Sequence, residues 1–486
     1  MSNVAEGVAI SNPFEVTSSR TLQLTRALLI LTAILALAVL TPLPLGWKEQ
    51  AMFGGTLIAL AVMLHVTFRS QTVTLALMTI SVFATVRYGY WRSAQTWEGM
   101  TSAGHLRQWD LIFVLLLLGA EFYAFATLIL GYFQTIRPLG RRPVALPSDV
   151  RTWPTVDVFI PTYNEPLSVV RATVLAALAI DYPAHKMNVI VLDDGRRDEF
   201  REFAAAVGVG YLTRETNAHA KAGNINHALE HTHGEFIAIF DADHIPTQSF
   251  LRMTLGWFVS DPRVGLVQTP HHFYSPDPFE RNLGRFRKVP NEGELFHRLV
   301  QDGNDLWNAS FFCGSCAVLR RKALEAIGGT AVETVTEDAH TALRLHRAGW
   351  STAYVNIPLA AGLATESLAS HIGQRVRWAR GMVQILRLEN PLFRRGLSAA
   401  QRLCYFNATT HFLFALPRLV FLTVPLVYLF FGRVNIYGYS LAVFAYALPH
   451  IVLSHVATSR SQRQYRFSFW NEIYEAVLDG YFTQPR

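Results

Sequence analysis

The chain has 486 residues, of which 51% are hydrophobic and only 16% are charged, whereas about 25% are charged in an ordinary soluble protein. This composition excludes intrinsic disorder as the main character of the chain, and three cysteines are too few for a disulfide framework. Part of the chain is therefore expected to face lipid, while the formal net charge of +7 fits nucleic acid, anionic lipid or a phosphate-bearing substrate equally well.

Apolar runs cluster near the two ends of the chain. A membrane-spanning helix needs about 20 predominantly apolar residues, so we expect about six spans. Four precede the polar middle of the chain and two follow it: Ala27–Leu45, Ala51–Phe68, Thr72–Val86, Leu111–Phe133, Phe412–Phe431 and Ile436–Val456. The third has the weakest pattern, because it is short and is followed by Arg87.

The distribution of arginine predicts the orientation of these spans. Arginines follow the fourth and the sixth span, namely Arg137, Arg141, Arg142, Arg151, Arg460, Arg463 and Arg466. Such residues are enriched at cytoplasmic helix ends, so the polar middle is expected in the cytosol, where the three cysteines stay reduced. We therefore divide the chain into membrane helices at 1–145, a cytosolic domain at 146–400 and further membrane helices at 401–486.

Charged and proline residues interrupt two of the expected spans. Glu121 lies inside the fourth, whereas Pro417 and Arg418 lie inside the fifth and are followed by Pro425. A charge within a membrane usually faces the interior of a helix bundle or a water-filled path. These residues indicate either a buried ion pair or a snorkelling arginine on the one hand, or a polar pathway through the membrane on the other.

The polar middle alternates short apolar runs with stretches of helical spacing. The expected strands are Val156–Ile160, Asn188–Leu192, a run around Tyr211, and Phe236–Phe240. The expected helices are Leu167–Ile180, Arg197–Val207 and Ala222–His231. This alternation predicts an α/β domain with a doubly wound, mostly parallel sheet, inserted between two groups of transmembrane helices. Ligands of such sheets bind beyond the carboxyl ends of the strands.

Acidic pairs follow two of these strands. Asp241 and Asp243 lie two residues apart just after a strand, where they could share Mg²⁺ or Mn²⁺, although aspartate is also common in ordinary turns. Asp193 and Asp194 could accept hydrogen bonds from a base or a ribose, or could simply form a turn with the glycine that follows. Lys221 opens a helix, a position that favours phosphate, although the nearby Asn224 could simply be a helix cap.

Two later segments complete the candidate chemistry. Asp338 begins a helical stretch at Ala339–Ala348, so its carboxylate could be a helix cap or a general base. Gln374, Arg377 and Trp378 share one face of the basic amphipathic stretch His371–Leu388. That face could bind phosphate and stack on a sugar or base, or it could lie on the membrane surface.

Four motifs in chain order resemble those of the processive, membrane-embedded family 2 glycosyltransferases: Asp193–Gly195, Asp241–Asp243, Thr336–Asp338 and Gln374–Trp378. The segments Phe311–Cys316, Val335–His340 and Gln401–Tyr405 are most similar to the catalytic subunits of bacterial cellulose synthases. The resemblance covers nearly all of the chain and implies a GT-A-type domain. It also implies a bacterial inner-membrane location with the catalytic domain in the cytosol.

The resemblance implies a role for each motif residue. The uridine of UDP-glucose would be bound by Thr162, Tyr163, Glu165, Asp193 and Asp194. The diphosphate would be bound by Lys221, Gln374 and Arg377, with Mg²⁺ (or Mn²⁺) between Asp241 and Asp243 and with His244 beside them. The acceptor glucan would stack on Trp378 near Phe312 and Cys313, with Asp338 as the base.

The implied reaction is an inverting transfer of glucose to the 4-hydroxyl of a growing β-1,4-glucan. The product would leave through a channel built by the enzyme's own spans, for which the candidate lining residues are Tyr88, Tyr90, Trp91, Glu121 and Arg418. Known members work with a periplasmic partner subunit. They also continue into a gating loop with an FxVTxK motif and a PilZ domain that binds cyclic di-GMP, neither of which occurs before Arg486. We therefore expect a truncated chain, with that regulation confined to its parent protein.

Other functions compete with this interpretation. A related synthase of curdlan, mannan, chitin or hyaluronan would share the catalytic motifs, and a nucleotide-sensing transporter without chemistry would share the spans. Nucleic acid is not expected as a partner, because the basic residues collect at membrane flanks and around Gln374–Arg377. Cys313 and Cys316 form a CxxC without a second pair, which argues against a zinc or redox site. His231, His233, His271 and His272 are expected as surface or sheet histidines.

Overall fold

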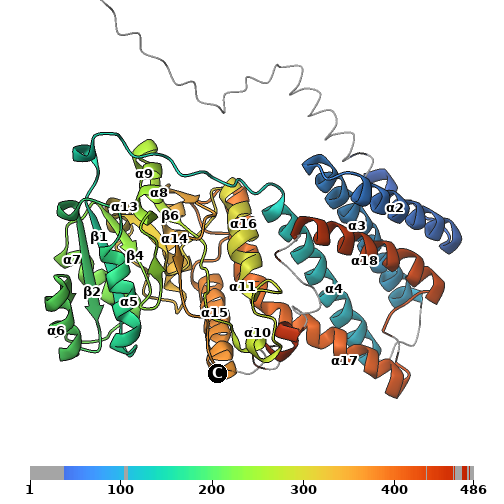
Figure 1. The fold of residues 1–486 in the computed structure, drawn as a ribbon. Helices are drawn as coiled ribbons and strands as arrows, with labels where there is room; N and C mark the ends of the chain where they lie inside the picture. Colours follow the sequence, from blue (N-terminus) through green and yellow to red (C-terminus); the bar gives the residue numbers. More distant parts are fainter. Residues whose placement is uncertain are drawn as a thin grey trace, which may run out of the picture.

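The computed structural model describes residues 35, 38–102, 108–433, 435–462, 465, 473–478 and 481. Figure 1 shows an α/β domain beside a bundle of long helices, with α15 and α16 between the two parts. The first expected span, Ala27–Leu45, lies largely outside the described residues, as do Arg463 and Arg466.

Five helical stretches of the described residues are long and apolar enough to cross a membrane. They contain α2 (Trp47–Thr67), α3 (Gln71–Ser102), α4 (Gln108–Thr135), α17 (Ala415–Phe431) and α18 (Ser440–Gln462). Helix α18 packs against α2 and α3, and α17 packs against α4, so the two groups of helices that are distant in sequence form one bundle. Large apolar side chains such as Leu429 and Phe430 remain exposed on this bundle, as expected for a surface that faces lipid.

Helix α3 continues well beyond the end expected from the sequence, because Arg87 and Arg92 are buried among polar partners. The Arg87 guanidinium donates to the backbone carbonyl oxygens of Leu40, Thr41 and Leu43 and to the side chain of Gln50. These contacts satisfy a charge that would otherwise end a membrane span.

Glu121 forms a buried ion pair inside the bundle. Arg92 Nε lies 3.1 Å from Glu121 Oε2, and the Tyr88 hydroxyl donates to Glu121 Oε1 at 2.7 Å. The side chain of Arg92 is fully buried. Of the two interpretations left open by the sequence, the described structure therefore shows the ion pair at Glu121. Arg418 likewise lies 3.0 Å from Glu475 Oε2.

The α/β domain contains a seven-stranded sheet. In spatial order its strands are β3 (Gly210–Leu212), β2 (Met187–Asp193), β1 (Val156–Thr162), β4 (Phe236–Ile239), β7 (Ala317–Arg320), β6 (Val264–Gln268) and β8 (Ser351–Tyr354). Every neighbouring pair is parallel except the two that involve β7. The prediction of a mostly parallel sheet is therefore confirmed, with one reversed strand. A separate ribbon pairs β5 (Ile245–Pro246) with β9 (Ala360–Ala361).

Helices cover both faces of the sheet. Val158 packs with α5 (Leu167–Leu178) and α6 (Asp198–Val207), whereas its neighbour Phe159 faces the other core with α7 (Ala220–His231) and α14 (Glu337–Arg347). Successive strand residues point to opposite faces, so strands with two apolar faces require helices on both sides. Full burial of each such side chain stabilises the fold by about 1.5–3 kcal/mol.

The remaining elements connect this layer to the membrane helices. They are α8 (Phe250–Thr254), α9 (Gly256–Ser260), α10 (Pro278–Asn282), α11 (Glu292–Glu294), a π-helical turn at Leu295–Val300, α12 (Gln301–Leu306), α13 (Arg321–Ala326), α15 (Leu368–Leu388), α16 (Ala399–Thr410) and short 3₁₀ turns at Val150–Thr152, Ala184–Lys186 and His411–Phe414.

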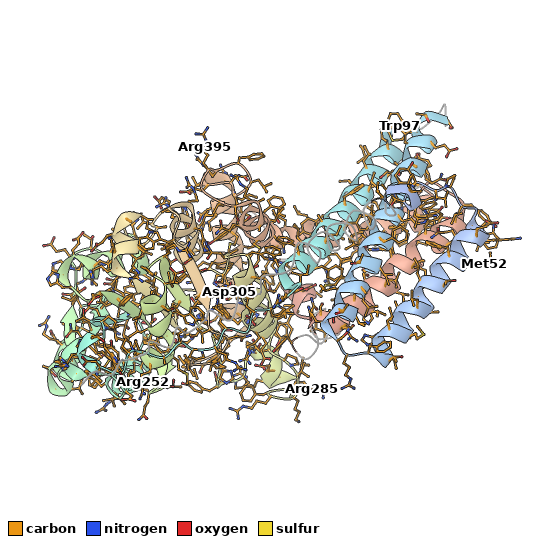
Figure 2. All side chains as sticks on the ribbon, turned by 90° about the horizontal axis from the view of Figure 1, so that it is seen from above. Met52, Trp97, Arg252, Arg285, Asp305 and Arg395 are labelled. Atoms are coloured by element: carbon orange, nitrogen blue, oxygen red, sulfur yellow. The ribbon has the colours of Figure 1, made fainter. Side chains whose placement is uncertain are left out.

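A seam of buried polar contacts joins α4 to the α/β domain. Gln134 Nε2 donates to Asn304 Oδ1 at 3.0 Å, and Asn407 Nδ2 donates to Gln134 Oε1 at 2.5 Å. Arg141 forms an ion pair with the buried Asp305, which Figure 2 labels between Met52 on the bundle and Arg252 on the far side of the domain. The domain is therefore fixed to the bundle by directional contacts as well as by apolar packing.

Candidate active site

The carboxyl ends of β1, β2 and β4 meet at one edge of the sheet. Thr162 is the last residue of β1 and pairs in register with Asp193, the last residue of β2. Asp241 follows β4, which pairs with the other side of β1. The strand-end residues that the sequence singled out are therefore brought together, as the topology rule for such sheets requires.

The loop after β1 is organised by Glu165. Its Oε2 accepts hydrogen bonds from Thr162 Oγ1 and from the backbone N–H of Tyr163, both at 2.8 Å. The Tyr163 side chain remains exposed beside this loop. An aromatic ring presented by a rigid loop is suited to stack on a flat base.

Asp193 is buried and its carboxylate is already occupied by protein donors. It accepts from the backbone N–H groups of Gly195 and Arg197 at 2.9 and 2.8 Å, from the Arg197 guanidinium at 2.8 Å, and from the Tyr211 hydroxyl at 3.0 Å. Asp193 therefore shapes the turn after β2, and a direct contact with a nucleotide stays a prediction.

Asp194 forms a bidentate ion pair with Arg214, a residue that the sequence motifs did not indicate. Arg214 Nε and Nη2 each lie 2.7 Å from one carboxylate oxygen of Asp194. The same guanidinium donates to the carbonyl oxygens of Ala218 and Ala220, at the start of α7. Arg214 thus links the turn after β2 to the helix that carries Lys221.

Lys221 provides a positive charge beside the acidic pair. Its ammonium group forms an ion pair with Asp241 and donates to the carbonyl oxygen of Gly314 at 2.6 Å. Burial alone would raise the pKa of Asp241, but Lys221 and His244 outweigh burial and hold that pKa below its ordinary value. Asp241 is therefore ionised at neutral pH.

Asp243 lies beside Asp241 and also anchors the backbone that follows β9. Its Oδ2 accepts from the backbone N–H of Leu363 at 3.0 Å, while its Oδ1 lies 3.2 Å from His244 Nδ1. Two carboxylates in this arrangement are the oxygen ligands that Mg²⁺ and Mn²⁺ prefer, so the residues fit a hard divalent cation.

Asp338, in the first turn of α14, has the properties of a general base. Burial raises the pKa of its carboxyl to about 7, and the neighbouring charges of Glu337 and Asp241 add to this rise. One of its oxygens accepts from the backbone N–H of Ala339 at 2.8 Å. Its pKa is therefore matched to proton transfer near neutral pH.

Gly314 separates this base from the acidic pair. Its φ is +86°, and a Cβ added there would lie 3.1 Å from Asp338 Oδ2 and 3.6 Å from Lys221 Nζ. The absence of a side chain thus lets Lys221 and Asp338 approach the same loop.

Replacing Gly314 with alanine should lower both stability and activity. The left-handed backbone conformation should cost about 1–2 kcal/mol in the free energy of unfolding, and the methyl group should displace the Asp338 carboxylate. We expect a lower thermal midpoint and a fall in turnover that exceeds the fall in folded protein. Gly284→Ala is the matched control, because Gly284 also has a positive φ but no atom lies within 4 Å of the added methyl. Equal turnover in the two variants would contradict this prediction.

Helix α15 presents Trp378 through an ion pair that the sequence analysis did not identify. Arg375 Nη2 lies 2.7 Å from Glu292 Oε2, and the Arg375 guanidinium lies 4.2 Å from the centre of the Trp378 ring. His371 Nε2 lies 3.2 Å from the same carboxylate oxygen. Burial opposes ionisation of Glu292, but Arg375 and His371 lower its pKa to about 2. Arg375, held by its ion pair with Glu292, therefore packs against the indole ring of Trp378.

Arg377 is exposed, and within the part of the chain that the structure describes it has no hydrogen-bond or ion-pair partner. Among the described residues, the Gln374 side chain makes only a long contact, 3.5 Å, with Arg375 Nη1. Both side chains are thus available to a ligand at this face of α15.

Phe312 and Cys313 occupy different environments. Phe312 is 2% exposed and belongs to the core between the sheet and α14. Cys313 is partly exposed; its thiol lies 3.1 Å from Gln301 Nε2, and its backbone N–H donates to Gln268. Their expected contact with an acceptor therefore stays a prediction.

Comparison with family models and known proteins identifies relatives along most of the chain. The model "glycosyltransferase like family 2" matches residues 154–381, and the model "cellulose synthase" matches residues 325–465. The chain is 56% identical, over 94% of its length, to the cellulose synthase catalytic subunit (UDP-forming) of Pseudomonas fluorescens, and it covers 61% of that protein. It is 57% identical, over 95% of its length, to the same subunit of Xanthomonas axonopodis, and it covers 62% of that protein.

A third relative is the cellulose synthase 1 catalytic subunit (UDP-forming) of Komagataeibacter xylinus, at 51% identity over 98% of the chain. The chain covers 64% of that protein, so it spans about three fifths of the length of these relatives. Among solved structures, a mannosyltransferase from Pyrobaculum calidifontis in complex with GDP-Man and Mn²⁺ aligns with a TM-score of 0.53 at 20% identity, covering 76% of this chain and 96% of that one. This likeness confirms the GT-A-type fold.

Proposed function

Because this chain is a homologue of the cellulose synthase catalytic subunits over nearly its whole length, we propose that it transfers glucose from UDP-glucose to a growing β-1,4-glucan. The observation that carries the proposal is the position of Asp338. A carboxyl group with a pKa of about 7 lies across Gly314 from the ion pair of Lys221 and Asp241. A base and a phosphate-binding site this close together are suited to glycosyl transfer from a nucleotide sugar.

In the proposed reaction Asp338 takes the proton from the 4-hydroxyl of the acceptor glucose. The hydroxyl oxygen forms a bond to the anomeric carbon of UDP-glucose as the bond from that carbon to the UDP oxygen breaks. UDP leaves with the electron pair. A single displacement inverts the α-linked donor to a β-linked product, so no covalent glycosyl-enzyme intermediate is needed.

We assign the donor to the edge of the sheet where β1, β2 and β4 end. Thr162, Tyr163, Glu165, Asp193 and Asp194 would form the uridine site. Asp241 and Asp243 would bind Mg²⁺ or Mn²⁺, which neutralises charge on the diphosphate when bound. Lys221, Gln374 and Arg377 would also contact the diphosphate, with His244 beside the carboxylates. The unpartnered guanidinium of Arg377 supports this role.

The acceptor would lie against Trp378, near Phe312 and Cys313. An indole fixed by Arg375 is a flat apolar platform for the face of a sugar ring. In the bundle, Trp91 stacks on Tyr446, with ring centres 4.7 Å apart, and also on Tyr88. These aromatic residues support the proposed path for the glucan through the membrane; Tyr90, Glu121 and Arg418 remain candidates for its lining, with Glu121 and Arg418 held in ion pairs.

The apolar helices of the chain support a membrane setting for this reaction. The chain is a membrane protein with five described helices long enough to cross a bilayer. We propose the bacterial inner membrane as its location, with membrane helices at 1–145 and 401–486 and a cytosolic catalytic domain at 146–400. A periplasmic partner subunit, and control by cyclic di-GMP through a PilZ domain of the parent protein, belong to this proposal.

The proposal is tested by supplying radiolabelled UDP-glucose to membranes that contain the full-length parent protein. The insoluble product should be degraded by a β-1,4-specific glucanase and should resist a β-1,3-specific glucanase. The reverse pattern would indicate a curdlan synthase. A complete absence of polymer, with UDP binding intact, would favour a nucleotide-sensing transporter.

A further inference from the structure

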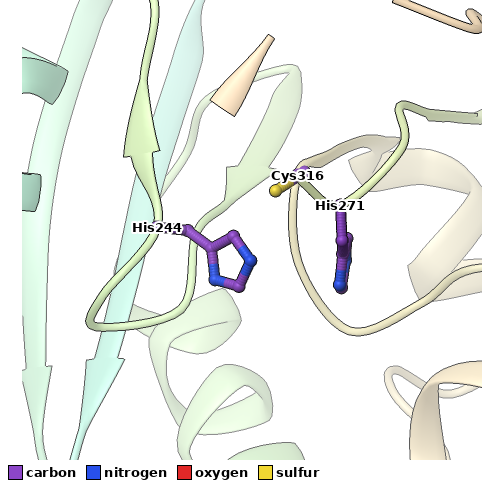
Figure 3. A group of neighbouring side chains, drawn as sticks. All are labelled: His244, His271 and Cys316. Atoms are coloured by element: carbon purple, nitrogen blue, oxygen red, sulfur yellow. The ribbon is translucent and has the colours of Figure 1, made fainter. Parts of the chain in front are cut away.

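Two histidines and a cysteine gather beside the acidic pair. His244 precedes β5, His271 follows β6, and Cys316 precedes β7. One potential ligand atom from each of the three lies within 4.8 Å of the others. Figure 3 shows the Cys316 sulfur between the two imidazole rings. His271, which the sequence analysis expected as a surface or sheet histidine, lies in this cluster.

The buried side chain of His244 lies beside two carboxylates but makes no aligned hydrogen bond among the described residues, with Nδ1 3.8 Å from Asp241 Oδ2. Only 4% of this residue is exposed, and among the described residues neither ring nitrogen has a hydrogen-bond partner. Its Nδ1 lies 3.2 Å from Asp243 Oδ1 without the alignment of a hydrogen bond. Buried polar atoms in native proteins are normally satisfied, so the Nε2 of His244, which has neither a hydrogen bond nor an ion-pair contact among the described residues, is suited to bind a ligand.

The backbone holds the His244 ring in this position. A Cβ added to Gly362 would lie 2.8 Å from His244 Nε2 and 3.0 Å from its Cε1, so this strand edge packs directly on the ring. The ring centres of His244 and His271 lie 4.9 Å apart, and His271 stacks on His297 at 4.7 Å. Both imidazoles are therefore positioned by packing rather than by hydrogen bonds to each other.

The other two side chains are suited to be ligands. His271 Nε2 lies 3.2 Å from the carbonyl oxygen of Ser315, and donation from Nε2 would leave Nδ1 with its lone pair. Metal-ligating histidines usually donate their second nitrogen to such an acceptor. The Cys316 thiol is fully buried, and its polar neighbour among the described residues is the Ser315 hydroxyl, 3.6 Å away. The second cysteine of the CxxC, Cys313, is instead engaged with Gln301.

We propose that His244, His271 and Cys316 bind a borderline-soft transition-metal ion, typified by Zn²⁺, at a site separate from the carboxylates of Asp241 and Asp243. Two imidazoles and a thiolate suit Zn²⁺, whereas Mg²⁺ prefers oxygen ligands. Bond lengths of about 2.0–2.3 Å place ligand atoms about 3.3–3.7 Å apart, so the cluster closes by about 1 Å on binding. The Cys316 thiol loses its proton to solvent as the metal–sulfur bond forms.

This site goes beyond the proposed function and would regulate it. His244 belongs to the proposed metal site and also lies beside the carboxylates that would bind the catalytic cation. A metal ion held by His271 and Cys316 engages His244 and restrains the adjacent Asp243. Zn²⁺ is therefore expected to inhibit the enzyme in a manner that depends on Cys316.

The test uses Co²⁺ as a spectroscopic probe, added to the purified chain in detergent with a large excess of Mg²⁺ to occupy the carboxylates. We expect one Co²⁺ per chain, with a thiolate-to-cobalt charge-transfer band that Zn²⁺ removes. The band should be lost in Cys316→Ser and retained in Cys404→Ser, whose thiol is equally buried in α16. Outer partners of metal ligands change affinity by about 10- to 100-fold, so His271→Asn, which removes a ligand, should weaken Co²⁺ binding at least about 100-fold.

Three results would overturn the proposal: no charge-transfer band in the wild type, a band that survives Cys316→Ser, or a band that requires Cys313 instead. Size-exclusion chromatography checks the fold of each variant, and His271→Asn decides the matter if Cys316→Ser does not fold. The measurement needs no UDP-glucose. Its failure is thus distinct from a failure of the proposed glucan synthesis.

Discussion

Replacing Asp338 with asparagine should lower the rate of glucan synthesis by about 10²- to 10⁴-fold, the usual contribution of a positioned general base. Asparagine has the same shape, and its amide oxygen can still accept the hydrogen bond from the Ala339 backbone. It cannot take a proton from the acceptor hydroxyl. The measurement is the initial rate of glucose incorporation from radiolabelled UDP-glucose into insoluble polymer.

The control for this variant is UDP binding, which should change little because Asp338 is not placed against the nucleotide. A rate within threefold of the wild type would contradict the base assignment. The pH profile is a second readout. Because burial raises the pKa of Asp338 to about 7, wild-type activity should fall as pH decreases through that value, and this dependence should vanish in Asp338→Asn.

The raised pKa of Asp338 favours activity at higher pH, but it lowers the stability of the fold there. A carboxyl group whose pKa is higher in the folded than in the unfolded chain destabilises the fold as pH rises toward the folded value. Asp338→Asn should therefore melt at a higher temperature than the wild type at about pH 8, and the difference should shrink toward about pH 5. An inactive variant that is more stable than its parent would separate a catalytic effect from misfolding.

Replacing Asp241 with asparagine should lower activity by about 10²- to 10³-fold or more, because the variant loses a ligand for the cation that neutralises the leaving diphosphate. It also leaves Lys221 without its carboxylate partner. We expect the Mg²⁺ concentration for half-maximal activity to rise and UDP binding to weaken, in contrast to Asp338→Asn. Mg²⁺ titrations of activity and calorimetric titrations of UDP measure the two effects.

The matched control for that variant is Asp181→Asn. Asp181 is also an aspartate paired with a cation, Arg252, but both of these side chains are exposed. Its replacement should leave the Mg²⁺ dependence unchanged. An Asp241→Asn enzyme with wild-type Mg²⁺ dependence would show that the cation is bound elsewhere.

The strands that position the site could be predicted because each is an apolar run that ends in polar residues. The observed β1, β2 and β4 end within two residues of their predicted ends. The reversed strand β7 could not be predicted in this way. Its direction is set by pairing Phe236 with Arg320, which are far apart in sequence, and no local pattern encodes that pairing.

The candidate site, like the sheet, could be predicted only in part from the sequence. Short motifs identified the residues that gather, but not the partners that hold them. Asp193 is engaged by Tyr211, and Arg375 by Glu292, through contacts that only the folded chain creates. The end of α3 was misjudged for a related reason: Arg87 looks like the end of a span until the carbonyl oxygens of residues 40–43 surround it.

The polar seam between α4 and the α/β domain has a consequence for how the chain is made. Gln134 exchanges hydrogen bonds with Asn304 and Asn407, and Asn407 lies 273 residues later. A ribosome adds about 5–20 residues per second, so α4 is synthesised about 14–55 s before its last partner exists. Through that interval the end of α4 must rely on water or on the insertion machinery. Docking of the catalytic domain onto the membrane helices is therefore expected to be a late event in biogenesis, after synthesis has reached α16.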